Sequence, residues 1–188
     1  MLLHIPTLML ALLLGFLLLT LALGVSQQGV RARPEIQRWT LGCWALLAGF
    51  ALLAAGVALP MALSVVLGNA LICLGLAFYA QALHRLLCDG HGPKALLQVQ
   101  PAIWLALLLM LDWPLSQRTA LLSLVYSPLL LPSVAVILRH GWRAERSLRV
   151  VAVTMALAVA ALLVRAAHAL LQPDDYGALM QASLGQGL

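Results

Sequence analysis

Long, nearly uncharged apolar runs are the feature that most limits what this chain can fold into. A helix needs about 20 apolar residues to cross the hydrocarbon core of a bilayer, and six runs reach or approach that length. Only 9% of the 188 residues are charged, whereas about 25% are charged in a soluble domain. We therefore predict an all-α integral membrane protein that forms one six-helix transmembrane bundle over residues 1–188. The expected spans cover residues 5–25, 39–59, 61–87, 96–111, 120–138 and 150–171.

The first run is interpreted as a true span and not as a signal peptide. Residues 1–6 contain no Lys or Arg, whereas a signal peptide begins with a basic segment. The apolar stretch is also longer than the about 7–15 residues of a typical signal peptide.

The positions of the basic residues predict how the bundle sits in the membrane. Cytoplasmic loops carry an excess of Lys and Arg, so the side that holds most of them is expected to be the inner one. The net charge of +5 is then explained by cations placed on one side of the bilayer, and it gives no indication of a nucleic-acid partner. Both ends of the chain are expected outside, and Arg118 is the cation of the outer connections. The cations of the inner connections are Arg31, Arg33, Arg38, Arg85, Lys94, Arg139, Arg143, Arg146 and Arg149.

Arg165 is an ionisable residue inside an expected span, about two turns before Pro173. A charge within a span indicates a functional site by default. One interpretation makes Arg165 a contact for an anionic ligand or the partner of Asp112. The other lets the long side chain extend outward to the membrane surface. Both interpretations stay open, because burial cannot be read from sequence.

Two histidines are expected near the same outer edge. His168 follows Arg165 by three residues, on nearly the same helix face, and His4 begins the first span. The two could hold a metal or a haem, or they could be polar residues at the membrane surface. No third ligand or fixed spacing supports a metal site, so we predict no metal and no cofactor.

Polar residues within the third expected span complete the candidate ligand site. Ser64 and Asn69 lie in its outer half. The Asn69 amide must find a partner in lipid, and a hydrogen bond to another helix is a more common partner than a ligand. In the fifth span, Pro128 and Pro132 remove two backbone donors and are expected to bend the helix. This bend could be a hinge, a pocket wall or a fixed shape.

The second expected span carries small residues along one stripe. Gly42, Ala45, Gly49 and Gly56 follow one another at spacings of three, four and seven residues. Small residues let helices approach closely where lipid gives no hydrophobic drive. The stripe therefore predicts a packing face, either within the bundle or between two protomers.

The sequence contains no familiar catalytic motif. The Walker loop, HExxH, GxSxG and CxxC patterns do not occur in it, so we expect no enzymatic activity from this chain. Cys43 and Cys73 fall inside apolar runs and Cys88 lies near a predicted inner end. We expect no structural disulfide among them.

Three short motifs stand in the first 90 residues. They are Ile-Pro-Thr at Ile5–Thr7, an aromatic-bearing segment with Leu-Gly at Arg38–Trp44, and LSVVLGNAL at Leu63–Leu71. Together they resemble the membrane input region of bacterial GGDEF-type diguanylate cyclases. The second half of the chain is similar to that region only in its hydropathy and in the spacing of its spans.

The resemblance implies a sensory module in the bacterial inner membrane that regulates a cytoplasmic enzyme making cyclic di-GMP from two GTP. It also implies a homodimer, because those cyclases act as pairs. The chain departs from the family in having no Gly-Gly-Asp-Glu-Phe stretch. A cytoplasmic output needs an odd number of spans from an outer N-terminus, so we expect a seventh helix just beyond Leu188. The alternative is a stand-alone relative that has lost its output.

These sequence features are compatible with three functions. The leading hypothesis is a signal-input domain that binds an unknown small ligand at the outer ends of spans one, three and six. A small transporter or channel would need polar residues along a continuous path, and the few polar residues here cluster at the ends of the spans. A haem or metal protein would use His4 and His168, and an absorption spectrum would detect it.

Overall fold

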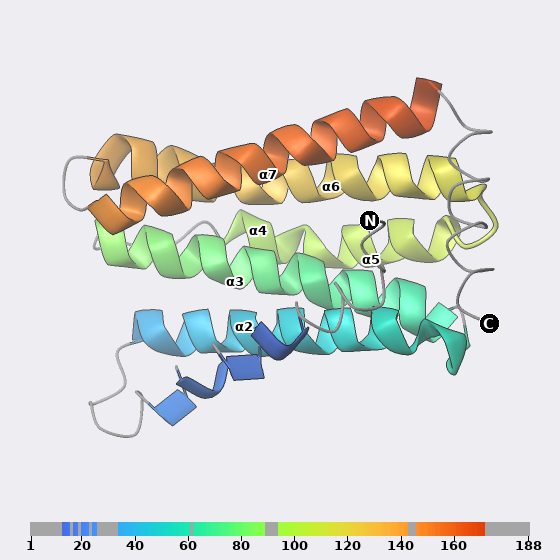
Figure 1. The fold of residues 1–188 in the computed structure, drawn as a ribbon, viewed down its shortest axis with the longest axis horizontal. Coiled ribbons are helices and arrows are strands. Elements are labelled where there is room, and N and C mark those ends of the chain that lie inside the picture. The colour runs from blue at the N-terminus through green and yellow to red at the C-terminus, as the bar shows by residue number, and fades with distance from the viewer. Residues whose placement is uncertain are drawn as a thin grey trace, which may run out of the picture.

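The structure, a computed structural model, is an antiparallel bundle of helices (Figure 1). It describes residues 13–15, 17–18, 20–22, 24–25, 34–60, 62–88, 94–142 and 146–171. Within these ranges every element of regular secondary structure is helical. The elements are α2 (Pro34–Ala54), the 3₁₀ turn η1 (Ala55–Val57), the π-helical η2 (Ala62–Leu67), α3 (Gly68–Cys88), α4 (Ala95–Gln98), α5 (Gln100–Leu109), α6 (Leu115–Val136), the π-helical η3 (Ile137–Gly141) and α7 (Arg146–Leu171).

Four helical segments are long and apolar enough to cross a membrane. They correspond to the second, third, fifth and sixth expected spans, so the prediction of an all-α protein is confirmed for the described residues, and four of the six expected spans have the length and apolarity to cross a membrane. The first expected span, residues 5–25, falls largely outside the described residues. The four segments are Glu35–Ala54, Ala62–Cys88, Leu115–Gly141 and Arg146–Leu171.

The fourth expected span, residues 96–111, corresponds to a shorter apolar segment, Ala95–Leu109. At the helical rise of 1.5 Å per residue this segment extends about 22 Å, less than the about 30 Å of the hydrocarbon core. It is divided into α4 and α5 by a turn at Val99. Pro101 stands in the first turn of α5, where a residue without an N–H group is tolerated.

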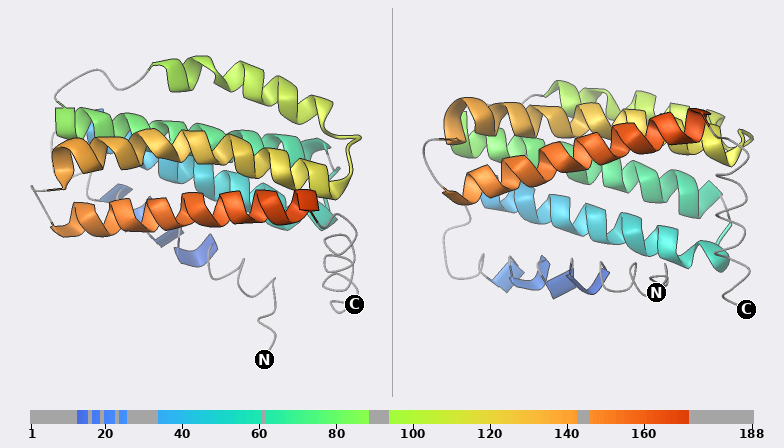
Figure 2. Two further views of the ribbon diagram at one scale, coloured as in Figure 1. Left: turned by 90° about the horizontal axis from the view of Figure 1, so that it is seen from above. Right: turned by 45° about the horizontal axis from the view of Figure 1, so that its top comes forward.

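Helix α3 lies at the centre of the bundle, in contact with α2, α5 and α6. The left view of Figure 2 shows α4 and α5 on one side of the α3–α6 pair and α7 on the other. The most extensive helix contacts join α2 to α3 and α6 to α7. The bundle therefore consists of two antiparallel hairpins that meet along α3 and α6.

Two reciprocal pairs of glycines bring the backbones of α2 and α3 together. A Cβ atom added to Gly42 would lie 3.1 Å from the carbonyl oxygen of Gly75, and one added to Gly49 would lie 2.7 Å from that of Gly68. The reverse distances, from Gly75 to Gly42 and from Gly68 to Gly49, are 2.9 and 3.1 Å. The small-residue stripe of the second span is therefore a packing face within the bundle, because two of its glycines contact α3 directly.

Small hydroxyl residues line the buried face of α6. The hydroxyl of Ser123 donates to the Thr119 carbonyl and that of Ser127 donates to the Ser123 carbonyl, each at 2.8 Å. Such bonds to the preceding turn satisfy a hydroxyl without a partner from another helix. Pro128 and Pro132 both lie inside this helix, and the chain continues from it into the π-helical turn η3.

Apolar side chains form two buried clusters. One joins α3 to α6, η3 and α7, and the other joins α3 to α5. The buried members are Leu83, Val136, Ile137 and Ala152 in the first cluster, and Ala70, Leu107 and Met110 in the second.

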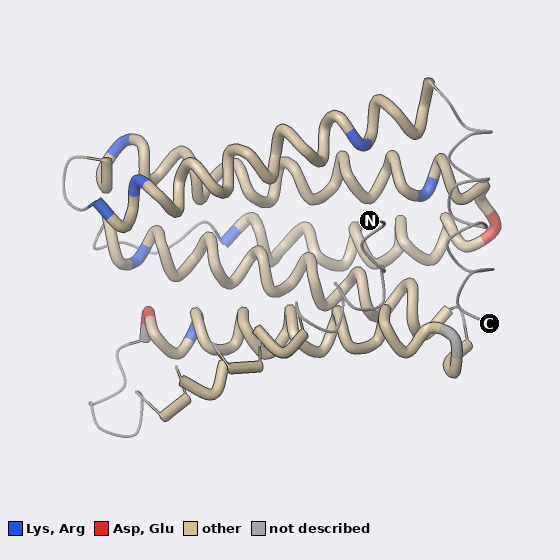
Figure 3. Tube along the Cα trace, viewed as in Figure 1, with Lys and Arg blue, Asp and Glu red and all other residues tan. Residues whose placement is uncertain are grey.

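Positive charge is distributed unequally between the two ends of the bundle (Figure 3). We call the end where α2 and α7 begin and α3 and α6 finish the basic end, and the opposite end the Asp112 end. Among the described cations, Arg118 and Arg165 lie toward the Asp112 end. Those toward the basic end are Arg38, Arg85, Lys94, Arg139, Arg146 and Arg149.

Candidate functional site

A hydrogen bond between α3 and α6 forms the centre of the candidate site. The Tyr126 hydroxyl donates to the side-chain oxygen Oδ1 of Asn69, and the Asn69 amide nitrogen donates to the backbone carbonyl of Val65 at 2.5 Å. Asn69 is only 5% exposed, so both halves of its amide are satisfied away from solvent, as buried polar groups generally are. The prediction that Asn69 finds a partner on another helix is confirmed.

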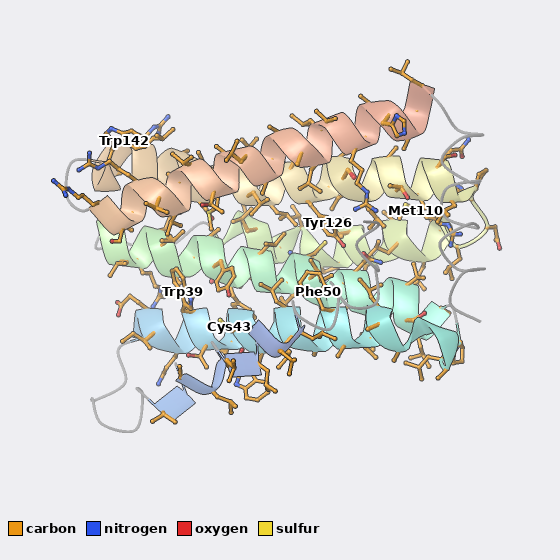
Figure 4. All side chains as sticks on the ribbon, in the orientation of Figure 1. Trp39, Cys43, Phe50, Met110, Tyr126 and Trp142 are labelled. Atoms are coloured by element: carbon orange, nitrogen blue, oxygen red, sulfur yellow. The ribbon has the colours of Figure 1, made fainter. Side chains whose placement is uncertain are left out.

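Arg165 of α7 brings a third helix to this contact. Its guanidinium interacts electrostatically with Tyr126, while the Arg165 side chain as a whole is exposed. Figure 4 shows Tyr126 between the helices, in the half of the bundle toward the Asp112 end. We call Asn69, Tyr126 and Arg165 the Tyr126 junction, because Tyr126 contacts or interacts with both of the others.

The remaining candidate residues lie in other positions. Ser64 is buried in η2, where its side chain faces the position of Gly56. Asp112 is exposed in the turn that follows α5, and His168 is exposed near the end of α7. His4 lies outside the described residues. Of the candidates, the structure therefore joins Asn69 and Arg165 through Tyr126.

Tyr126 is the residue of this junction that the sequence analysis does not single out as a site residue. The sequence feature that could have identified Tyr126 is its phenol group inside an apolar run, because a buried Tyr hydroxyl usually needs a hydrogen-bond partner. Its partner is 57 residues away along the chain. Only the register of α6 against α3 brings the two side chains together, and no local pattern gives that register.

A second set of polar contacts joins α2 to α3 closer to the basic end. The Arg38 guanidinium donates to the side-chain oxygen of Gln81. The Cys43 sulfur and the Tyr79 hydroxyl share a hydrogen bond of 2.9 Å, and the ring of Trp39 packs on that of Tyr79 with centroids 5.1 Å apart. Figure 4 labels Trp39 and Cys43 on α2. Cys43 is fully buried, so its thiol contributes to packing and is closed to solvent reagents.

The Tyr126 junction combines a phenol, an amide and a guanidinium. These groups can bind an anion or a carbonyl oxygen through hydrogen bonds, and the guanidinium adds positive charge. Within the described part of the chain, no group of three His, Cys, Asp or Glu side chains could hold a metal ion. The hypothesis of a haem or metal site at His4 and His168 stays a prediction, because His4 is not described.

Four helices that are long and apolar enough to cross a membrane indicate a helical membrane protein, and hydrogen bonds between side chains join three of them, α2 to α3 and α3 to α6. Comparisons of the chain with protein-family models, with curated proteins and with solved structures found no match.

Proposed function

We propose that this protein is a membrane-embedded signal-input domain of a bacterial inner membrane. It binds a small ligand toward the Asp112 end and regulates a cytoplasmic output such as a diguanylate cyclase. The Tyr126 junction is the observation that carries this proposal, because it joins two candidate ligand residues on different helices.

The distribution of charge supports the orientation. Six of the eight described Lys and Arg residues lie toward the basic end, and cytoplasmic ends of membrane helices carry the excess of such residues. With the basic end in the cytoplasm, the Tyr126 junction lies in the outer half of the membrane. A ligand then reaches it from outside the cell or from the outer leaflet.

The packing of α7 supports a transmitting role for this helix. In its most apolar stretch only 11% of the residues are buried, compared with 50% for the segment that contains α3. The buried residues of α7 follow one narrow stripe, Ala152, Val159, Ala166 and Ala169. Because so little of α7 is buried, it can shift with less loss of packing than α3, and the interaction between Arg165 and Tyr126 is one of the contacts that such a shift changes.

The mechanism follows from these contacts. A ligand that engages Arg165 competes with Tyr126 for the guanidinium and shifts α7 relative to α3 and α6. Such a ligand changes the balance between two arrangements only as far as it binds one of them more tightly. The two prolines in α6 leave this helix with fewer backbone hydrogen bonds, so it deforms more readily than an uninterrupted helix.

The nature of the output is supported by the resemblance of Ile5–Thr7, Arg38–Trp44 and Leu63–Leu71 to the input regions of diguanylate cyclases. The transporter hypothesis has less support, because the larger cavities between the described helices have mainly apolar linings. One such cavity lies between α5 and α6, and another between α3 and α5.

A cyclic di-GMP measurement tests the proposal. The chain is expressed in a bacterium that contains diguanylate cyclases, and the cellular cyclic di-GMP concentration is compared with that of cells carrying an empty vector. We expect the wild-type chain to change this concentration and Tyr126→Phe, which removes the hydroxyl of the junction, to reduce the change. Thr154→Val is the matched control, because Thr154 is exposed on α7 and donates only to its own helix at Val150.

Membrane levels of the three proteins are equalised by immunoblotting before the comparison. An unchanged cyclic di-GMP concentration with the wild-type chain contradicts a cyclase output. Equal effects of Tyr126→Phe and Thr154→Val contradict a signalling role for the Tyr126 junction.

A further inference from the structure

A cavity of about 290 Å³ opens at the basic end, where α3 and α6 finish. This is the volume of about ten water molecules. We call it the η3 pocket, because the η3 turn forms part of its wall. It lies at the opposite end of the bundle from the Asp112 turn, and it shares no residue with the Tyr126 junction. Its lining residues are His84, Cys88, Pro132, Ala135, Val136, Arg139 and His140.

The rim of the η3 pocket carries the Arg139 guanidinium and the imidazole groups of His84 and His140. Arg139 and His140 come from η3 and are exposed. His84, from the last turns of α3, lines the same space. The Arg139 guanidinium attracts an anion in this space, and the imidazole N–H groups can donate hydrogen bonds to it.

Other described cations lie at the same end of the bundle as the pocket. Arg85 is in the last turn of α3, and Arg146 and Arg149 are in the first turns of α7. This excess of positive charge favours an anionic partner from outside the protein.

The floor of the η3 pocket is apolar, and this feature favours a lipid over a free anion as the ligand. Pro132, Ala135 and Val136 of α6 supply the floor. Trp142 follows η3 directly, is 40% exposed and lies at the basic end (Figure 4). Tryptophan is enriched where hydrocarbon meets lipid headgroups. A phospholipid joins a phosphate to acyl chains and so fits both the rim and the floor, whereas a phosphate ion gains nothing from the floor.

A metal ion does not fit the same residues. His84, Cys88 and His140 line one cavity, yet they are not among any group of three potential ligands close enough to hold a metal in the described part of the chain. Basic pockets between membrane helices on the cytoplasmic side commonly hold anionic headgroups. The chemistry of the lining therefore favours a phosphate ester over a cation.

We propose that the η3 pocket binds the headgroup of an anionic phospholipid such as phosphatidylglycerol. Arg139 and His140 contact the phosphate, and the apolar floor on α6 contacts the start of an acyl chain. The bound lipid joins the end of α3 to the end of α6 at the inner surface of the membrane. This site does not depend on the proposed signalling role, because its residues and its ligand are different.

Native mass spectrometry of the purified full chain in detergent tests the proposal. Dioleoyl phosphatidylglycerol and dioleoyl phosphatidylcholine are titrated separately, and the apparent Kd of the first lipid adduct is measured for each. We expect tighter binding of phosphatidylglycerol to the wild-type protein. Removal of one surface Lys or Arg is expected to weaken this binding about fivefold, so Arg139→Gln should show a loss of that size, and His140→Gln, which replaces an uncharged donor, should show a smaller one.

Two further variants separate the pocket from general surface charge. Arg149→Gln removes an exposed cation of the basic end that does not line the pocket, and it is expected to leave the Kd unchanged. Ala135→Leu keeps every charge but fills the floor at an exposed position of α6, and it is expected to weaken binding. Circular dichroism confirms that each variant keeps the helix content of the wild type.

Three results would overturn the proposal. One is equal affinity for phosphatidylglycerol and phosphatidylcholine. Another is an equal loss with Arg149→Gln and Arg139→Gln, which would indicate diffuse attraction to the basic end. The third is protection of the protein by inorganic phosphate alone to the same extent as by phosphatidylglycerol in a thermal unfolding assay, because the apolar floor would then have no role.

Discussion

Substitution of Gly49 by Ala tests the contact that brings α2 and α3 together. The added Cβ would lie 2.7 Å from the Gly68 carbonyl oxygen and 2.8 Å from Cγ1 of Ile72. An ordinary contact begins at 3.4 Å, so the two helices would have to separate by about 0.7 Å at this position. The nearest atom is backbone oxygen, which cannot rotate away as the end of a flexible side chain can.

The magnitude follows from two opposing effects. Ala is favoured over Gly within a helix by about 1 kcal/mol, and this effect alone would stabilise the variant. Forcing extra volume into a packed interface costs about 1–3 kcal/mol. A clash with backbone belongs at the upper end of that range, so we expect Gly49→Ala to lower the free energy of unfolding by about 1–2 kcal/mol.

Gly56→Ala is the matched control in this experiment. Its added Cβ would lie 3.5 Å from the Ser64 hydroxyl oxygen, an ordinary contact, so we expect no loss of stability. Both variants are unfolded in mixed micelles by increasing the fraction of sodium dodecyl sulfate, and helix content is followed by circular dichroism. If Gly49→Ala proves as stable as Gly56→Ala, the close approach of α2 to α3 at this glycine is refuted.

Two other contacts give predictions that need only purified protein or intact cells. In a double-mutant cycle, Asn69→Ala and Tyr126→Phe are expected to show a coupling free energy of about 0.6 kcal/mol, the average for hydrogen bonds between membrane helices, and no more than about 1.7 kcal/mol, whereas additive effects would exclude the bond. Cys43 and Cys73 are buried and Cys88 is exposed, so a maleimide should label Cys88 alone before unfolding. An impermeant maleimide should reach Cys88 only after cell lysis but should reach Asp112→Cys in intact cells; labelling of Cys88 in intact cells, with Asp112→Cys labelled only after lysis, would reverse the proposed orientation.

The membrane-spanning helices follow from hydropathy, but their ends do not. The apolar run that predicts residues 39–59 belongs to a helix that begins earlier, at Pro34. Hydropathy records which residues suit the hydrocarbon core, whereas a helix continues wherever its backbone hydrogen bonds continue. Residues 96–111 show a different limit, because Gln98, Gln100 and Pro101 interrupt the apolar run at the turn at Val99, and a window average over the whole span does not register this break.

The candidate site was predictable in part. A lone amide in an apolar run indicates that Asn69 needs a partner, and a charge in the last span draws attention to Arg165. The identity of the partner depends on how α3 and α6 are aligned, since Tyr126 is distant in sequence. That alignment is set by close packing along whole helix faces, including the hydroxyl-bearing face of α6. Which faces contact each other cannot be predicted from a single sequence.

The division of the bundle into two hairpins has a consequence for its internal motion. The glycine contacts leave α2 and α3 almost no space to slide, because backbone meets backbone at both Gly42–Gly75 and Gly49–Gly68. The second hairpin meets the first where α3 packs against α6 and η3, and where Ala152 of α7 joins the buried cluster around Leu83. A displacement between the hairpins therefore has to move these faces past each other, with the α2–α3 pair as the rigid unit. The bond between Tyr126 and Asn69 crosses this contact, so a displacement there has to break it.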